Sequence, residues 1–132
     1  PDNIHLTTLY GQNIPAVKAN TERLEAVFQN LLSNAIQALT PTGGEIQIRS
    51  QYTDQNKVEI IISDNGPGIP PTLQGQIFDP GVSGKDGNLG LGLWLVETFI
   101  NQFNGRIGFT SSAAEGTTFT IVLQPINFGI LN

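Results

Sequence analysis

Residues 20–39 have the sequence NTERLEAVFQNLLSNAIQAL, and this stretch decides the fold. Its apolar residues recur with the period of an α-helix, at Leu24, Val27, Phe28, Leu31, Leu32, Ala35, Ile36 and Leu39. Asn20 is a typical helix N-cap, and the run Thr-Pro-Thr-Gly-Gly at 40–44 is a typical helix breaker. The sequence therefore predicts one long helix over these residues, with one face buried in a core.

On both sides of this helix, alternating apolar residues predict β-strands, at 4–9, about 46–52, about 58–62, 106–111 and 117–123. A short helix is expected near 72–77. A second amphipathic helix is expected over about 91–103, with a core face made of Leu95, Val96, Phe99, Ile100 and Phe103. This order predicts an α+β fold, a two-layer sandwich with the helices on one face of a mixed sheet.

The composition limits what the chain can bind. Its 132 residues suit a single domain, 1–132, and its formal net charge of -5 opposes binding to nucleic acid or to an anionic membrane surface. It contains no cysteine, and no apolar run approaches the roughly 20 residues that cross a bilayer. It also contains no methionine, which indicates a piece of a longer protein. We expect neither nucleic-acid binding nor direct membrane contact from this piece.

Two polar residues are expected on the buried side of the sheet. Asp64 continues the strand phase of Ile60 and Ile62, and Thr117 shares the phase of Phe119. A buried carboxylate needs hydrogen-bond donors, which a bound ligand could supply. The alternative is that Asp64 merely begins the turn over residues 64–66 and that Thr117 is an ordinary strand threonine.

Three amide side chains, Asn30, Asn34 and Gln37, fall within roughly 60° of one another on the long helix and flank its apolar stripe. Amide oxygens are suitable ligands for Mg²⁺, so these residues could line a polar cleft. The alternative is a solvated helix flank.

The segment 84–93, Gly-Lys-Asp-Gly-Asn-Leu-Gly-Leu-Gly-Leu, leads directly into the second helix. Glycines before a helix N-terminus expose backbone amides that can hold phosphate, and Lys85 could add a positive charge. The segment matches neither the Walker pattern nor the dinucleotide fingerprint. A glycine loop without any ligand is the alternative.

Together these elements resemble the ATPase family that joins gyrase B, Hsp90, histidine kinases and MutL, over about residues 3–125. Residues 30–35 resemble its N box, 64–69 its G1 box, 77–80 its F box and 90–93 its G2 box. The resemblance implies the Bergerat ATP-binding fold, with ATP and Mg²⁺ as cofactors.

The resemblance also implies roles for individual residues. Asn30 and Asn34 would hold Mg²⁺ and, with Lys85, would act in catalysis. Asp64 would accept from the adenine amino group, with Thr117 assisting through water. The nucleotide-binding residues would be Asn34, Gln37, Asp64, Gly66, Gly68, Ile69, Phe78, Lys85, Gly90, Leu91, Gly92, Leu93 and Thr117.

Within this family the sequence most resembles a histidine kinase of the nitrogen-regulation type. The family members that hydrolyse ATP, namely gyrase, Hsp90 and MutL, carry at the position of Asn30 a glutamate that activates water. An amide cannot take a proton from water, so Asn30 argues against a dedicated ATPase. The single histidine, His5, has no acidic residue after it and is not expected to accept phosphate. The resemblance therefore implies an acceptor histidine on a separate dimerisation domain, a downstream response regulator and a cytoplasmic location. It leaves open whether the parent protein is anchored in a membrane.

Two other functions remain open at this point. A serine protein kinase of the anti-sigma-factor type shares the same boxes. The other is a degenerate pseudokinase that acts through protein contacts. Three departures from the family pattern suggest it. Gln37 stands at a usually basic position, small residues occupy 81–85, the segment that would cover the nucleotide, and the first glycine of the G2 segment is displaced to Gly87.

Overall fold

In the computed structural model, which describes residues 3–81 and 92–126, the chain forms five strands and three helices. In chain order these are β1 (Ile4–Tyr10), α1 (Thr21–Ala38), β2 (Gly44–Tyr52), β3 (Val58–Asp64), α2 (Pro71–Gln74), α3 (Gly92–Gln102), β4 (Arg106–Ser112) and β5 (Gly116–Leu123). Every strand predicted from the alternating pattern is therefore present, within a few residues of its expected bounds.

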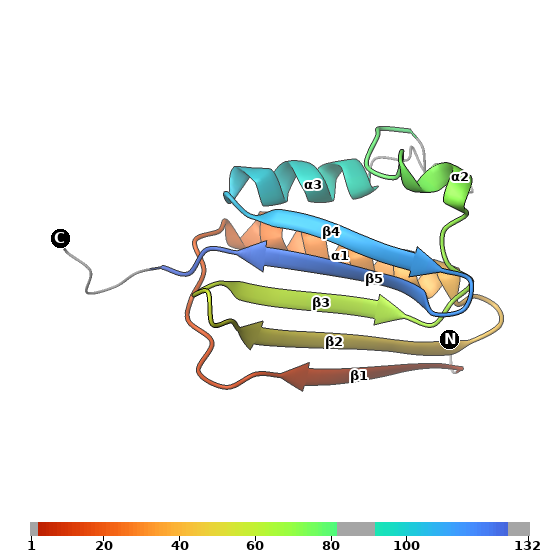
Figure 1. Cartoon of the computed structure of the whole chain (residues 1–132), viewed down its shortest axis with the longest axis horizontal. Helices are drawn as coiled ribbons and strands as arrows, with labels where there is room; N and C mark the ends of the chain where they lie inside the picture. The colour runs from red at the N-terminus through yellow and green to blue at the C-terminus, as the bar shows by residue number, and fades with distance from the viewer. Residues whose placement is uncertain (1–2, 82–91, 127–132) are drawn as a thin grey trace.

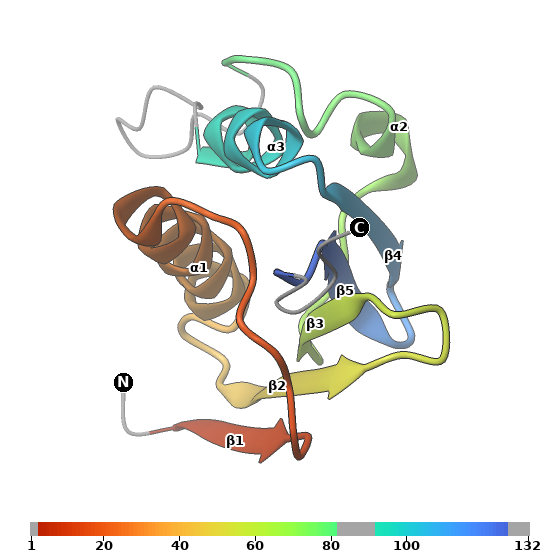
Figure 2. The same cartoon turned by 90° about the vertical axis from the view of Figure 1, so that its left-hand side faces the viewer.

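The strands form one sheet in the order β1-β2-β3-β5-β4 (Figure 1). The edge strand β1 runs parallel to β2, and the other neighbouring pairs are antiparallel. Figure 2 shows α1 and α3 on the same side of this sheet. The predicted two-layer α+β sandwich with a mixed sheet is thus confirmed.

The long helix α1 forms as its pattern predicts. The Asn20 side chain caps it by accepting a hydrogen bond from the Arg23 backbone N–H at 2.9 Å. Its apolar stripe is buried against the sheet and α3 at Val27, Leu31, Ala35 and Leu39. Among the described residues, no helix is long and apolar enough to cross a membrane.

The buried face of α3 differs from the prediction at Leu95 and Phe99, which are only half-buried, and at Leu93, which is buried but was not predicted to be. Its buried residues are Leu93, Val96 and Ile100, followed by Phe103 just beyond its last turn. Leu93 therefore takes the core position that was assigned to Leu95, because α3 begins at Gly92 and residues 93, 96 and 100 share one side of a helix. Leu95 is only half-buried, at the margin of that side.

The strand register brings three polar residues into one row. Asp64, at the end of β3, is the pairing partner of Thr117 on β5, and Thr117 is in turn the partner of Ser111 on β4. Partners in a sheet point to the same face, and here this is the face that carries the helices. The fold therefore gathers these side chains near the ends of three neighbouring strands.

Candidate functional site

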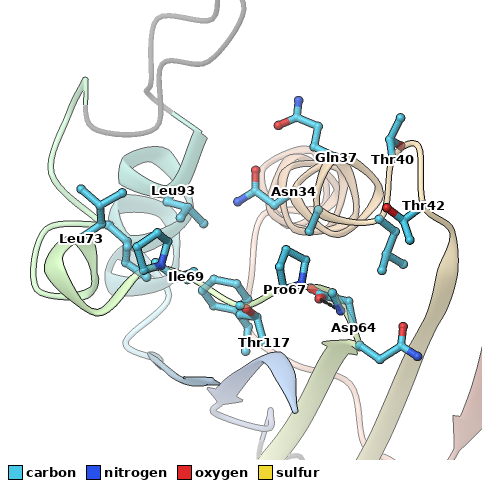
Figure 3. A pocket seen from close by; sticks show the side chains of 18 of the residues that line it. Asn34, Gln37, Thr40, Thr42, Asp64, Pro67, Ile69, Leu73, Leu93 and Thr117 are labelled. Carbon is cyan, nitrogen blue, oxygen red and sulfur yellow. Dashed lines mark hydrogen bonds between the residues drawn. The ribbon is translucent and has the colours of Figure 1, made fainter. Parts of the chain in front are cut away.

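A cavity of about 940 Å³ lies between α1 and the ends of β3 and β5 (Figure 3). Its lining comes from the end of α1 and the loop after it, from the turn after β3, and from α2, α3 and β5. The lining residues are Asn34, Gln37, Ala38, Leu39, Thr40, Thr42, Gly43, Asp64, Asn65, Gly66, Pro67, Gly68, Ile69, Pro70, Leu73, Ile77, Leu93, Thr117 and Phe119.

Asp64 is the carboxylate of this cavity, and it is only 9% exposed. Burial raises the pKa of its side chain above the ordinary value of an aspartate, and the backbone N–H groups of Gly66 and Thr117 offset part of that rise. The Gly66 N–H donates to Asp64 Oδ1 at 2.9 Å. The predicted buried orientation of Asp64 is therefore confirmed.

Thr117 is 6% exposed and lies beside Asp64, as its strand phase predicted. Its hydroxyl is 2.8 Å from the hydroxyl of Ser111, which also accepts a hydrogen bond from the Ile69 backbone N–H at 2.7 Å. The sequence analysis did not identify Ser111 as part of the site. The register of the predicted hairpin could have found it, since residues 111 and 117 are partners.

The turn after β3 requires its glycines for steric reasons. Gly68 has a φ of +81°, and a Cβ added there would lie 2.5 Å from the Ser112 carbonyl oxygen. A Cβ on Gly66 would lie 3.0 Å from Asp64 Oδ1 and 3.2 Å from the Cβ of Ala38. These glycines let the turn pass close to α1 and β4, so that backbone forms part of the cavity wall on this side.

The three amides of α1 occupy different environments. Asn34 is half-buried and lines the cavity, whereas Gln37 lines it from an exposed position at the margin. Asn30 does not line the cavity: its Nδ2 donates to the Ala26 carbonyl at 2.8 Å. Its Oδ1 lies where a Cβ on Gly92 would be only 2.9 Å away, so the start of α3 approaches α1 closely at this point.

The predicted F-box and G2-box residues are divided between the cavity and the core. Leu93 is 4% exposed and lines the cavity. Phe78 does not line it, because its ring packs edge-on against Phe109 and Phe119 at centroid distances of 6.1 and 6.5 Å. Gly92 is the first residue of α3.

The remaining residues of that prediction, Lys85, Gly90 and Leu91, lie outside the described residues.

Part of the lining was not predicted. The loop after α1 contributes Thr40, Thr42 and Gly43, and α2 contributes Leu73. Asn65 also lines the cavity, and its Oδ1 accepts from the Glu45 N–H at 2.8 Å, which ties the turn to β2. Only the tertiary arrangement brings Thr40, Thr42, Gly43 and Leu73 to the same cavity as Asp64.

The cavity combines one buried acceptor with an otherwise neutral lining. Among the described lining residues, Asp64 is the only one with an ionisable side chain, and Leu39, Ile77, Leu93 and Phe119 supply apolar walls. No group of three or more His, Cys, Asp or Glu side chains within the described residues could hold a metal ion. The arrangement suits a flat, largely apolar ligand that carries a hydrogen-bond donor.

Comparison with known proteins assigns the chain to a family. The family model described as "Histidine kinase-, DNA gyrase B-, and HSP90-like ATPase" matches residues 19–127, and the chain therefore belongs to this family. It is 40% identical to the sensory histidine kinase/phosphatase NtrB of Salmonella typhimurium, in an alignment that covers 93% of this chain and 38% of that protein. The sequence-based assignment to the histidine-kinase branch, nitrogen-regulation type, is confirmed.

A second relative is the signal transduction histidine-protein kinase AtoS of Escherichia coli (strain K12), 43% identical over 112 residues, which are 84% of this chain and 18% of AtoS. The chain thus spans well under half the length of these curated relatives.

Solved structures show the same fold. The catalytic domain of histidine kinase ThkA superposes with a TM-score of 0.77 at 31% identity, over 93% of this chain and 80% of that one. Full-length ShkA in complex with AMPPNP gives a TM-score of 0.78 at 22% identity, over 93% of this chain and 26% of that one. The similarity to ShkA supports the fold alone.

Proposed function

We propose that this chain is the ATP-binding catalytic domain of a sensor histidine kinase. The observation that carries the proposal is the buried pair of Asp64 and Thr117 at the end of the cavity. A buried carboxylate with a raised pKa is stabilised by a ligand that donates a hydrogen bond to it. The exocyclic amino group of adenine is such a donor, and the apolar walls are suited to its ring.

In this proposal the triphosphate points from the base toward the start of α3. Backbone amides at a helix N-terminus favour an anion, and α3 begins at Gly92, close to α1. Lys85, Gly90 and Leu91 are proposed to complete the phosphate site.

The amide oxygens of Asn34 and Asn30 are proposed to ligate Mg²⁺, which prefers oxygen ligands. The Asn30 amide nitrogen is already bonded to Ala26, which leaves its oxygen as the free end of that side chain toward α3. With few protein ligands, the ion would be held largely by the phosphates, and it would offset their negative charge when bound.

The cavity is better suited to holding ATP than to hydrolysing it. Asp64 is its only described ionisable residue and is proposed to be engaged by the base, so no second carboxylate among these residues is available to activate water. The role of the domain is then to position the γ-phosphoryl group for a nucleophile that comes from elsewhere.

The nucleophile is proposed to be a histidine on a separate dimerisation domain. His5 is exposed on β1, two strands away from β3, and it does not line the cavity. From the phosphorylated histidine the group would pass to a response regulator, and we propose that the domain acts in the cytoplasm.

Calorimetric titration tests this proposal. ADP and a non-hydrolysable ATP analogue would be titrated into the chain, each with and without Mg²⁺. We expect both to bind, with the analogue depending on Mg²⁺. A second assay would mix the chain and labelled ATP with the histidine-bearing domain of its parent protein and look for acid-labile label on histidine. Absence of binding at millimolar nucleotide would favour the pseudokinase, and label on serine would favour the serine kinase.

A further inference from the structure

Ser111 connects two segments at the end of the cavity where the base is proposed to bind, which is called the base end. The two segments are the turn after β3 and the strand β5. Its hydroxyl accepts from the Ile69 N–H, in the turn after β3, and is hydrogen-bonded to the Thr117 hydroxyl on β5. Thr117 lies between Ser111 and Asp64 in the row across β4, β5 and β3. Ser111 does not line the cavity itself, so any effect on a ligand would pass through Thr117.

The number of protons in this row restricts how Thr117 can act. A hydroxyl group offers one donor and two acceptor sites, and Ser111 already uses one acceptor site for the Ile69 N–H. Either hydroxyl could donate in the bond between Ser111 and Thr117. If Thr117 donates, the Ser111 proton is left without an acceptor among the hydrogen bonds of residues 3–81 and 92–126.

The opposite direction leaves the spare proton on Thr117, which lines the cavity, and not on Ser111, which does not. A hydroxyl that accepts an N–H becomes a better donor, so the Ile69 bond favours donation from Ser111 to Thr117. The proton of Thr117 is then free to point into the cavity. Thr117 becomes a donor beside the acceptor Asp64.

Gln74 holds this arrangement in place. Its Nε2 donates to the Ile69 carbonyl at 2.9 Å and lies 3.4 Å from the Ser111 carbonyl. Ile69 is therefore held through both its N–H and its carbonyl group, which keeps the N–H directed at Ser111. Gln74 supports the turn but makes no contact with the Thr117 hydroxyl in the described network.

We propose that Ser111 is a positioning residue that fixes the Thr117 hydroxyl as a donor and thereby makes the site select 6-amino purines over 6-oxo purines. The inference rests on the proposed function, since it needs the base beside Asp64. An acceptor next to a donor complements the amino group and bare N1 of adenine. A 6-oxo purine presents the reverse order, a carbonyl oxygen beside an N–H, and meets a mismatch at both positions.

The test compares the affinities of ADP and inosine diphosphate, which differ only at the 6-position and N1. We expect the unchanged chain to prefer ADP. In Ser111→Ala the Thr117 hydroxyl can rotate to accept, so the ratio of the two affinities should fall by about three- to tenfold. Ser111→Thr keeps a hydroxyl and should preserve the ratio.

The matched control is Ser112→Ala, the same change at the neighbouring residue, whose hydroxyl accepts from the Glu115 N–H and takes no part in the bond between Ser111 and Thr117. It should leave the ratio of the two affinities unchanged. If Ser111→Ala does not fold, as judged by thermal unfolding, Ser111→Cys is measured in its place, since a thiol of similar size is a weak donor and should also lower the ratio.

Two failures can be told apart. If the unchanged chain binds neither nucleotide, the proposed function fails and the inference fails with it. If it prefers ADP and the folded Ser111 variants keep the same ratio, only the inference is overturned. In that case Ser111 acts as a structural anchor of the turn, like Gln74.

Discussion

The two ends of the cavity are built differently. At the end proposed for the base, Asp64, Thr117 and Ser111 lie on strands and are held by hydrogen bonds to backbone or to each other. On the side proposed for the phosphates, the polar lining side chains from α1 are Asn34, which is half-buried, and Gln37, which is exposed. The base end is therefore formed before any ligand arrives, and substitutions there should have larger effects than substitutions on the phosphate side.

The largest expected effect is on folding of the base end. Gly116 precedes Thr117 with a φ of +82°, and a Cβ there would collide with the backbone of Asp64 and Asn65. Gly116→Ala should lower the free energy of unfolding by about 2–4 kcal/mol, measured by denaturant titration.

The control for this variant is Gly108→Ala in the neighbouring strand. An added Cβ at Gly108 has nothing within 4 Å, so this change should leave stability unaltered or raise it slightly. Equal losses of stability in both variants would show that the close approach at Gly116 is not what the fold depends on.

The next effect concerns binding. Asp64→Asn should weaken ADP binding by about 1.5–3 kcal/mol, the range for a hydrogen bond to a charged group. The same variant should be at least as stable as the unchanged chain at neutral pH, because it removes a carboxylate that is costly to bury in its charged form. Titration calorimetry and thermal unfolding measure the two effects.

Asp54→Asn is the matched control, since Asp54 is exposed in the turn between β2 and β3. It should alter neither affinity nor stability. Undiminished ADP affinity in Asp64→Asn would mean that the base does not bind at Asp64.

The raised pKa of Asp64 predicts that both the stability of the fold and its affinity for ADP depend on pH. The protonated carboxyl is favoured by burial, so this group adds to stability below the pKa of the unfolded chain and loses that contribution as the pH rises through the folded pKa. The base requires the charged form, so ADP affinity should be constant above the raised pKa and fall as the pH drops through it. Binding near that pKa should release a proton.

Calorimetry in buffers with different ionisation enthalpies measures this release. Asp64→Asn provides the control, because it retains any titration of the nucleotide itself. Equal proton release in the variant and the unchanged chain would rule out Asp64 as the group that titrates.

The sequence predicted the base end well for a physical reason. Strand phase has a period of two, so Asp64 and Thr117 could be placed on the buried face from Ile62 and Phe119 alone. The register between β3 and β5, which makes them partners, is a tertiary property. The register of the β4–β5 hairpin could have placed Ser111 beside Thr117, but its bond to the Ile69 N–H depends on the path of the turn after β3, which is also a tertiary property.

Local patterns were less informative where residues serve the core. Phe78 was predicted to bind the nucleotide, but its ring packs with Phe109 and Phe119. Leu93 was also predicted to bind the nucleotide, and it is part of the buried face of α3 as well as of the cavity lining. An apolar residue in a motif can serve either purpose, and only the packing around it decides between them.

The smallest expected effect compares two amides on the phosphate side. Asn34→Ala removes a half-buried amide of the cavity and should weaken the Mg²⁺-dependent binding of an ATP analogue by about 0.5–1.5 kcal/mol, as for one neutral hydrogen bond. Gln37→Ala makes the same kind of change one turn away, at an exposed position, and should cost less because water already solvates that side chain. ADP without Mg²⁺ should bind both variants as it binds the unchanged chain, since the base end is intact. A loss in Gln37→Ala equal to or greater than that in Asn34→Ala would place the phosphates nearer the margin of the cavity. The two ends of the cavity would then differ only in the exposure of their side chains, and that difference would not locate the phosphates.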